Sequence, residues 1–265
     1  GSCAQFYGCC EIDERDSGNL YDELLPAGLW LLWAYEAEDT LHDALKLSES
    51  KTLELLRRSY TSCSSSSSFD LYRCISTDLL VGLSKIHAIG IVHRDLKPEN
   101  IILTKNGVKF IDLGGAALCL GQPISYEPGI GPADPRYSKP NDKYLLPSST
   151  NIPESGNLDK LWAEYMPEKF DIFAIGLVML QLFVPRLRDP NALDMFKLEL
   201  EECGYDFMLW RKDVCCLSIG ELQVLDEGNG AGNEMIANML SPSRFSRKKA
   251  EELLEHRFFT LKDDI

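Results

Sequence analysis

The 265-residue sequence is short of several features that mark particular classes of protein. Positive charge is scarce, because 27 Lys and Arg stand against 41 Asp and Glu, which gives a net charge of -14. Nucleic-acid phosphates would repel such a chain, so we expect no nucleic acid among its partners. The longest apolar run, 170–185, includes Asp171 and Gln181 and falls short of the ~20 residues that a bilayer requires. We therefore expect a buried helix there and no membrane span in this chain.

Paired cysteines at metal-binding spacing are also missing. The nine cysteines are an odd number and include no C-x-x-C set of the kind that binds zinc. Two adjacent pairs, Cys9-Cys10 and Cys215-Cys216, have an awkward geometry for a bridge between neighbours. We therefore expect reduced and mostly buried thiols, with a regulatory role as the alternative.

Local patterns divide the chain into a beginning with two strands and a helical remainder. Apolar and aromatic runs at 3–13 and 29–35 predict two buried strands. The opening Gly1-Ser2, without Met, is typical of a protease-cleavage scar, so we expect the natural N-terminus to lie elsewhere. Apolar residues recur at helical spacing from Leu71 to Ile86, until Gly90. Helices are also expected at 39–48, 171–184, 190–203, 232–240 and 247–255, and loops at 62–68, across most of 142–168 and at 226–233.

The most informative stretch is HRDLKPEN, at residues 93–100, followed by Asp112 in an Asp-x-Gly motif. Between Asn100 and Asp112, two apolar runs flank Lys-Asn-Gly, a strong hairpin signal. The hairpin brings these two oxygen-bearing side chains together, as a Mg²⁺ site requires. On the preceding loop, Asp95 can orient a hydroxyl proton and Lys97 can neutralise a phosphoryl oxygen. These are parts that phosphoryl transfer needs.

HRDLKPEN with a following Asp-x-Gly resembles the catalytic and metal-binding loops of eukaryotic-type protein kinases. The resemblance implies that Asp95 is the catalytic base, that Lys97 contacts the γ-phosphate of ATP and that Arg94 organises the activation segment. It implies Asn100 and Asp112 as Mg²⁺ ligands. Lys97 two residues after Asp95 resembles the serine/threonine-specific pattern rather than the tyrosine-specific one.

Other positions agree with this resemblance or depart from it. Asp171 resembles the aspartate that opens the central buried helix and bonds back to the catalytic loop, and a plain helix N-cap is the alternative. Arg247 resembles the arginine that pairs with the glutamate of an Ala-Pro-Glu motif, but the motif here reads Lys-Pro-Asn at 139–141. We expect the activation segment to be anchored otherwise, and Arg247 could equally be a surface residue. Ser125 and Ser138 also lie in this segment, without a distinctive setting.

The implied fold class is α+β, a protein-kinase-like fold made mainly of the helical C-lobe. Residues 1–36 would be a remnant of the N-lobe, with two strands and the hinge. Residues 37–265 would be the C-lobe, with the activation segment at 112–141 and an insert at 142–168.

The nucleotide site would lie between these parts. If the run at 29–35 leads into the hinge, Trp33 is the gatekeeper, Ala34 and Glu36 offer backbone hydrogen bonds to adenine, and Leu103 is the apolar floor. No glycine-rich phosphate loop or Val-Ala-x-Lys-like strand precedes the catalytic loop, so we expect an N-terminally truncated kinase whose ATP binding is weakened by orders of magnitude. Its exposed sheet edge would favour dimerisation.

The runs IDLGGAA, DPRYSKP and YDFMLWR and the Pro/Ser-rich insert resemble the thylakoid state-transition kinases of green algae and plants, from about Trp30 to Trp210. Leu113 in place of the usual Phe belongs to that resemblance. It implies a place in the chloroplast thylakoid, with the kinase domain on the stromal side, and light-harvesting antenna proteins as substrates.

Two functions are therefore weighed. The first is an active serine/threonine kinase that uses ATP and Mg²⁺. The second is a pseudokinase or scaffold lobe that binds partners without catalysis. The complete set of Asp95, Lys97, Asn100 and Asp112 favours the first, because a non-catalytic lobe has no need of all four.

Overall fold

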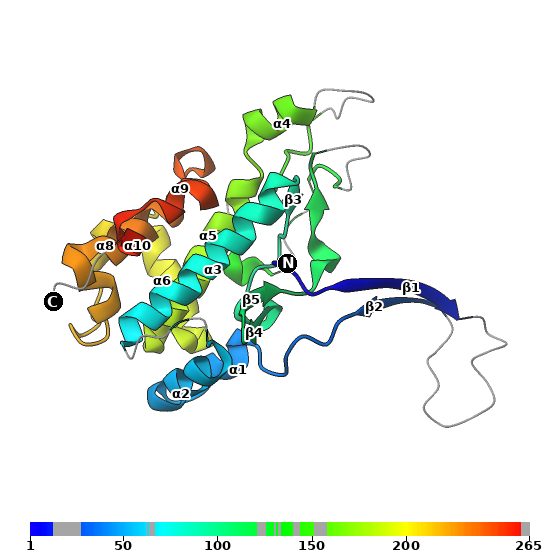
Figure 1. Ribbon diagram of the computed structural model, residues 1–265. Helices are drawn as coiled ribbons and strands as arrows, with labels where there is room; N and C mark the ends of the chain where they lie inside the picture. The colour runs from blue at the N-terminus through cyan, green and yellow to red at the C-terminus, as the bar shows by residue number, and fades with distance from the viewer. Residues whose placement is uncertain are drawn as a thin grey trace.

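A helical body and a projecting two-stranded arm make up the computed structural model (Figure 1). The body is formed mainly by helices, and its strands are short. No helix among the described residues has both the length and the apolarity that a bilayer crossing demands. The structure describes residues 1–12, 28–61, 63, 67–120, 126–129, 131, 134–139, 144–150 and 158–260.

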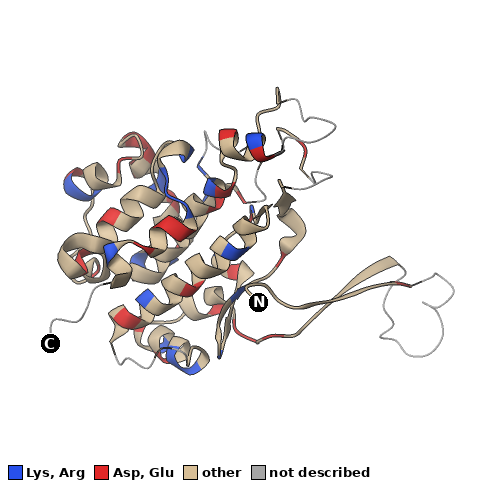
Figure 2. Cartoon of the chain, turned by 45° about the horizontal axis from the view of Figure 1, so that its top comes forward, with Lys and Arg blue, Asp and Glu red and all other residues tan. Residues whose placement is uncertain are grey.

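The arm consists of strands β1 (Phe6–Ile12) and β2 (Gly28–Trp33), which pair antiparallel. No residue of these two strands is buried, and Leu29 and Leu31 are 68% and 56% exposed. Charge is almost absent from the arm, where Glu11 is the one charged residue of the two strands (Figure 2). The predicted strands form, but the prediction that they are buried is wrong. Neither strand has a second sheet neighbour within the described residues, so the outer edge of each strand stays open, and the exposure of the side chains shows that the faces are not covered either.

The hairpin predicted between Asn100 and Asp112 is confirmed. Strands β4 (Ile101–Thr104) and β5 (Gly107–Phe110) pair antiparallel with Ile101 opposite Phe110. Gly107 has a φ of 126°, which glycine adopts at little cost in a tight turn. Beyond the strands, the Ile111 amide donates to the Asn100 carbonyl at 3.0 Å.

The root of the arm is joined to this hairpin. The Phe110 amide donates to the Ser2 carbonyl at 2.9 Å, and the Ala4 amide donates to the Phe110 carbonyl at 3.1 Å. The first residues therefore run beside β5 before the chain leaves the body. A further bond of 2.7 Å, from the Ala34 amide to the Gln5 carbonyl, closes the root on the β2 side.

Helix α5 (Glu168–Phe183) is the centre of the body, and all 16 of its residues are buried. It contacts α3 (Ser68–Ala88) and α8 (Gln223–Met239). Gly176 permits the close approach of α8, because a Cβ at this position would lie 3.0 Å from the Met239 Cβ. Each fully buried large apolar side chain in such a helix contributes about 1.5–3 kcal/mol.

The other expected helices form with slightly different bounds, while the sequence patterns predict neither α2 nor α7. Within α8, residues 227–230 are not helical, so the expected glycine-rich loop is a left-handed turn between two helical segments. The remaining helices are α1 (Leu41–Leu45), α2 (Glu49–Ser59), α4 (Leu158–Tyr165), α6 (Pro190–Glu202), α7 (Phe207–Asp213), α9 (Ala250–Leu254) and α10 (Arg257–Thr260). The remaining strands, β3 (Ile91–Val92) and β6 (Ala117–Leu118), pair with each other, and short 3-10 helices lie at Pro98–Asn100, Leu113–Gly115, Pro135–Tyr137, Pro185–Arg188 and Arg244–Ser246.

The nine cysteines are all free thiols, and the expectation that most are buried is wrong. Cys119 is buried, whereas Cys9 and Cys10 are exposed on the arm and Cys216 is exposed after α7. The other five are partly exposed. The adjacent pairs lie on segments that contribute little to the core, which explains their exposure.

Candidate active site

Asp171, in the first turn of α5, holds the loop that carries the HRD motif. Its carboxylate accepts the His93 amide at 2.7 Å and the Arg94 amide at 2.9 Å, and it lies 2.9 Å from the His87 Nε2 atom. The side chain is fully buried. The N-cap of α5 is Pro167, so Asp171 is not the cap and acts instead through the loop. These bonds stabilise Arg94 in a left-handed conformation, with a φ of 70° that non-glycine residues seldom adopt.

Asp95, Lys97 and Asn100 form one bonded cluster. The Lys97 Nζ atom lies 3.1 and 3.0 Å from the two carboxylate oxygens of Asp95. The Asn100 Nδ2 atom donates to the Asp95 Oδ2 atom at 2.9 Å and to the Asp95 carbonyl at 2.8 Å. Both donors thus fix the orientation of a carboxylate that is only 8% exposed.

Electrostatics keep Lys97 charged. Burial lowers the pKa of Lys97, but the hydrogen bond to Asp95 and the nearby carboxylates of Asp95, Asp134 and Glu99 outweigh it and raise the pKa above the ordinary lysine value. Asp134 contributes from a distance of 3.9 Å between its Oδ2 atom and the Lys97 Nζ atom. An ammonium ion is therefore available beside Asp95 at neutral pH.

Asp112 follows β5 in a left-handed conformation, with a φ of 57°, and its Oδ1 atom accepts the Gly114 amide at 3.3 Å. Asn100 precedes β4, and the bond from the Ile111 amide to the Asn100 carbonyl sets the two segments side by side. The hairpin therefore brings Asn100 and Asp112 to the same end of the ribbon. Amide and carboxylate oxygens are ligands that Mg²⁺ prefers, so the donor chemistry of this pair fits that ion.

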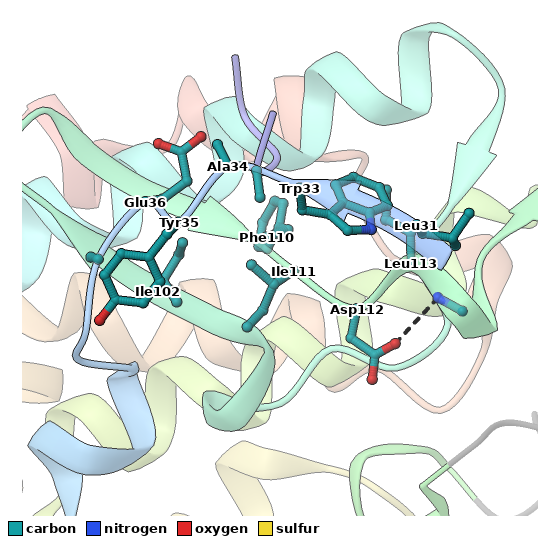
Figure 3. Close-up of a pocket in the computed structure, with 13 residues that line it drawn as sticks. Leu31, Trp33, Ala34, Tyr35, Glu36, Ile102, Phe110, Ile111, Asp112 and Leu113 are labelled. Atoms are coloured by element: carbon teal, nitrogen blue, oxygen red, sulfur yellow. Dashed lines mark hydrogen bonds between the residues drawn. The ribbon is translucent and has the colours of Figure 1, made fainter. Parts of the chain in front are cut away.

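A cavity of about 540 Å³ lies between the root of the arm and the hairpin, with Asp112 at its edge (Figure 3). Its size is within the range of small-molecule sites. The charged residues of its described lining are Glu36 and Asp112, and neither Lys nor Arg is among them. The lining residues are Ala4, Leu31, Trp33, Ala34, Tyr35, Glu36, Ala37, Ile102, Phe110, Ile111, Asp112, Leu113 and Gly114.

The cavity includes Trp33, Ala34 and Glu36 as the sequence predicts, but it does not include Leu103. Leu103 is 2% exposed and belongs to the hydrophobic core. Ile102 lines the cavity in its place (Figure 3). Successive side chains of a strand point to opposite faces, so the two neighbours cannot both face a ligand. The run Ile-Ile-Leu at 101–103 is apolar throughout, so the sequence pattern does not indicate which of its side chains faces the cavity.

The side chain of Glu36 has a structural role of its own. Its Oε2 atom lies 2.6 Å from the Lys109 Nζ atom, and its Oε1 atom accepts the Gln5 amide at 3.0 Å. The bond to Lys109, with that to Gln5, lowers the pKa of Glu36. The Ala34 amide is engaged by Gln5, so Ala34 has its carbonyl to offer to a ligand.

Arg94 connects the HRD loop to the chain that follows Asp112. Its Nη1 atom donates to the Gly115 carbonyl at 3.0 Å and its Nη2 atom to the Gly131 carbonyl at 2.6 Å. The guanidinium also lies 4.8 Å from the centre of the Tyr126 ring. One side chain thus holds three points of the segment expected to be the activation segment.

A clamp from α6, which no sequence pattern predicts, holds residues 134–139. The Lys197 Nζ atom donates to the Pro135, Arg136 and Ser138 carbonyls at 3.0, 2.5 and 3.1 Å. The Arg136 guanidinium forms a two-point contact with Asp194, at 2.9 and 3.1 Å. These contacts with α6 anchor residues 134–139, where the sequence lacks the glutamate of an Ala-Pro-Glu motif. No sequence signal would have singled out Lys197, because a lysine on a helix is normally a solvated residue.

Arg247 is buried, with 1% exposure, so its interpretation as a surface residue is wrong. Its guanidinium donates to the Ser241 and Lys169 carbonyls at 3.0 and 3.1 Å and lies 5.0 Å from the Phe173 ring centre.

Ser138 is also buried, and its hydroxyl lies 3.2 Å from the Pro135 carbonyl. Ser125, Pro140, Asn141, Ser62 and residues 64–66 lie outside the described residues.

The sequence is similar to those of known protein kinases. A family model described as protein kinase domain matches residues 29–132. The chloroplastic serine/threonine-protein kinase STN7 of Arabidopsis thaliana is 34% identical over 97% of this chain and 47% of its own length. The chloroplastic kinase STN8 of the same plant is 32% identical over 99% of this chain and 54% of its own length. The chain thus spans about half the length of these curated relatives.

A solved structure agrees with the fold. The crystal structure of a Stt7 homolog from Micromonas algae, soaked with ATP, superposes with a TM-score of 0.89 and is 36% identical, over 100% of this chain and 77% of that one. The predicted α+β kinase fold is therefore confirmed, as is the resemblance to the chloroplast kinases. On these grounds, the chain belongs to the protein kinase family.

Proposed function

We propose that this chain is the catalytic domain of a serine/threonine protein kinase, which transfers the γ-phosphate of ATP to a protein hydroxyl. The observation that carries the proposal is the bonded cluster of Asp95, Lys97 and Asn100, set beside Asp112 and a cavity of nucleotide size. A lobe that only bound partners would need neither an oriented carboxylate nor a charged lysine paired with it.

The cavity suits the adenine ring. Ile102 would lie against one face of the base, and the backbone of Ala34 and Glu36 would meet its hydrogen-bonding edge. Asn100 and Asp112 would hold Mg²⁺, which neutralises phosphate charge when bound. In this proposal residues 1–36 supply the hinge side of the site and residues 37–265 the catalytic side.

The chemistry of transfer would fall to the HRD loop. Asp95 would accept the proton of the substrate hydroxyl and orient its oxygen toward the phosphorus atom. Lys97, charged at neutral pH, would stabilise the negative charge on the transferred phosphoryl group. Asp171 would act as a positioning residue, because it holds the loop backbone and touches neither substrate nor nucleotide.

We expect this chain to bind ATP weakly. Its described cavity lining contains no cation that could clamp the phosphates. Each missing charge-assisted bond to a phosphate costs about 1.5–3 kcal/mol. One such bond already weakens binding by an order of magnitude or more.

Nucleotide binding can be tested through Trp33, which lines the cavity. We expect Mg²⁺ with ATP to change the intrinsic fluorescence and to raise the unfolding temperature. Trp33→Phe should remove most of the fluorescence change, and Asp112→Asn should weaken the Mg²⁺-dependent part of the thermal shift. Unaltered signals up to millimolar ATP would contradict a nucleotide site.

Catalysis is tested by transfer of labelled phosphate. We expect Asp95→Asn to abolish transfer while nucleotide binding stays nearly intact, because the amide keeps the shape but accepts no proton. Because this chain is expected to bind ATP weakly, a longer chain of the protein is assayed beside it, and a longer chain that binds ATP but transfers no phosphate would be a pseudokinase or scaffold lobe instead.

The relatives suggest the setting. STN7 and STN8 are chloroplast kinases, which supports a chloroplast location for this protein. We infer a kinase domain on the stromal side of the thylakoid that phosphorylates light-harvesting antenna proteins in state transitions. Purified antenna complexes should then be labelled far better than casein, and equal labelling of both would argue against an antenna-specific kinase.

The exposed arm is the natural place for self-association. Phe6, Leu29 and Leu31 are 48%, 68% and 56% exposed on a ribbon that is almost uncharged. A second copy could cover these side chains by packing its own arm against this face, and the free strand edges could pair as well. Sedimentation should show a concentration-dependent dimer that Leu29→Lys with Leu31→Lys disrupts. A wild-type chain that stays monomeric at high concentration would exclude it.

A further inference from the structure

Two cysteines, one after α2 and one on α3, lie in direct contact. The sulfur atoms of Cys63 and Cys74 are 2.8 Å apart. Cys63 follows α2, and Cys74 lies on α3. Both are free thiols, partly exposed, and both pack against the main hydrophobic core. Within the part of the chain that the structure describes, no other contact between two cysteines is present.

The surrounding bonds hold the two thiols together. Tyr60, which is 2% exposed, lies three residues before Cys63. Its hydroxyl donates to the Asp78 Oδ2 atom at 2.7 Å and lies 3.1 Å from the Cys74 carbonyl oxygen, so Tyr60 is held against α3. Thr61 donates its hydroxyl to the Lys105 carbonyl in the turn of the β4–β5 hairpin at 2.8 Å. On the other side, Ser67 caps α3. Cys63 therefore lies between anchored residues, and its approach to Cys74 is part of the fold.

We propose that Cys63 and Cys74 are a dithiol that closes reversibly into a disulfide when it meets a small-molecule or protein disulfide. This would be a modification site in the kinase body, and it does not depend on the proposed transfer of phosphate. The two cysteines are partly exposed, so a small disulfide can reach them, and they lie close enough to bond after a short movement.

The contact also assigns an order to the two sulfurs. The Cys74 thiol donates to the Cys63 sulfur, so Cys63 is the acceptor. Burial, followed by the bond to Cys63, raises the pKa of Cys74 to about 12. Because the thiolate is the nucleophile, Cys63 would attack first and Cys74 would resolve the mixed disulfide.

The exchange balances without any further reagent. The Cys63 thiolate attacks one sulfur of an oxidant R–S–S–R, which gives Cys63–S–S–R and releases one thiolate, RS⁻. Cys74 then loses its proton to solvent and attacks the Cys63 sulfur, which gives the intramolecular disulfide and a second RS⁻. The two protons from the cysteines end on the two released thiols. The protein dithiol is oxidised by two electrons, and the oxidant is reduced by two.

Closure would tie the end of α2 to α3. It removes conformational freedom from the unfolded chain across residues 63–74, so the oxidised protein should unfold at a higher temperature. The same loop contacts the hairpin turn through Thr61 and Lys105. The disulfide would therefore also brace the end of the hairpin opposite Asn100 and Asp112.

The test is oxidation of the folded chain with oxidised glutathione, then alkylation of remaining thiols and peptide mapping. We expect a linked peptide that contains Cys63 and Cys74. The other seven of the nine cysteines should lie outside any intramolecular link. The unfolding midpoint should rise by several degrees and return with dithiothreitol.

Variants separate this site from the exposed thiols. Cys63→Ser and Cys74→Ser should each abolish the link and the rise of the midpoint, whereas Cys203→Ser, which replaces another partly exposed thiol, should leave both unchanged. After oxidation, a glutathione adduct on Cys63 in Cys74→Ser, with little adduct on Cys74 in Cys63→Ser, would identify Cys63 as the attacking thiol and Cys74 as the resolving one. Complete alkylation of Cys63 and Cys74 after oxidation, or separate glutathione adducts on each without a link, would overturn the proposal.

Discussion

Helix α5 and the β1–β2 arm are both rich in apolar residues, but they have opposite surroundings. All 16 residues of α5 are buried, whereas no residue of the two described strands is. The helix contacts α3 and α8, and its Asp171 side chain bonds to the backbone of the HRD loop. Among the backbone bonds described, the arm is joined to the body near its root, where Ser2 and Ala4 bond to Phe110.

The difference shows that apolar composition does not by itself determine burial. An apolar segment is buried only where other elements cover it, and an isolated two-stranded ribbon has too few neighbours for that. We therefore expect the free energy of unfolding to depend strongly on α5 and weakly on the arm. The following predictions test this contrast, from the largest effect to the smallest.

Removal of the Asp171 carboxylate should have the largest effect. Asp171→Ala leaves the buried His93 and Arg94 amides without their acceptor, so we expect a loss of about 3–5 kcal/mol in stability by urea unfolding. Asp194→Ala, which removes an exposed partner of Arg136, should cost less than about 1 kcal/mol. Similar losses from the two variants would refute the central role of Asp171.

A leucine in each region tests the contrast directly. Leu177→Ala in α5 should cost about 2–5 kcal/mol, because a cavity replaces a fully buried side chain. Leu31→Ala on the arm, where the side chain is 56% exposed, should change stability by no more than about 0.5 kcal/mol. Both are measured by urea unfolding. A large loss from Leu31→Ala would mean that the arm is covered in solution.

The clamp on residues 134–139 should have an intermediate effect. Lys197→Met leaves three carbonyls without their common donor, and we expect a loss of about 1–3 kcal/mol. Hydrogen exchange should be faster at residues 134–139 and unchanged on the arm. Lys212→Met, at an exposed position of α7, is the matched control and should alter neither quantity.

The cap of α1, at the junction of arm and body, should have the smallest effect. The Thr40 hydroxyl and amide bond to the Asp43 carboxylate and lower the pKa of Asp43. Thr40→Ala should cost about 1 kcal/mol near neutral pH. Because the folded pKa is lowered, this stabilisation is complete above the ordinary value of 3.8 and is lost as the pH falls through the folded value. The difference in the free energy of unfolding between wild type and Thr40→Ala should therefore shrink in acid. A difference that stays constant with pH would argue that the Asp43 carboxylate does not contribute to the cap.

The β4–β5 hairpin and the central helix could be predicted because their signals are local. The Lys-Asn-Gly turn and the flanking apolar runs are sufficient for β4 and β5, and the length of the apolar run is sufficient for α5. The positions of Leu103 and Lys197 could not be predicted. The first depends on which face of an all-apolar strand meets the cavity, and the second on carbonyls about 60 residues away in the chain.

The attachment of the arm at Phe110 makes it a lever. The seven residues of β1 extend for about 23 Å at about 3.3 Å per residue. A turn of about 10° at the root would displace the far end by about 4 Å over that length. The arm is attached at Phe110, two residues before Asp112. A force on the far end of the arm would therefore produce a torque on β5 beside Asp112, the residue proposed to hold the metal.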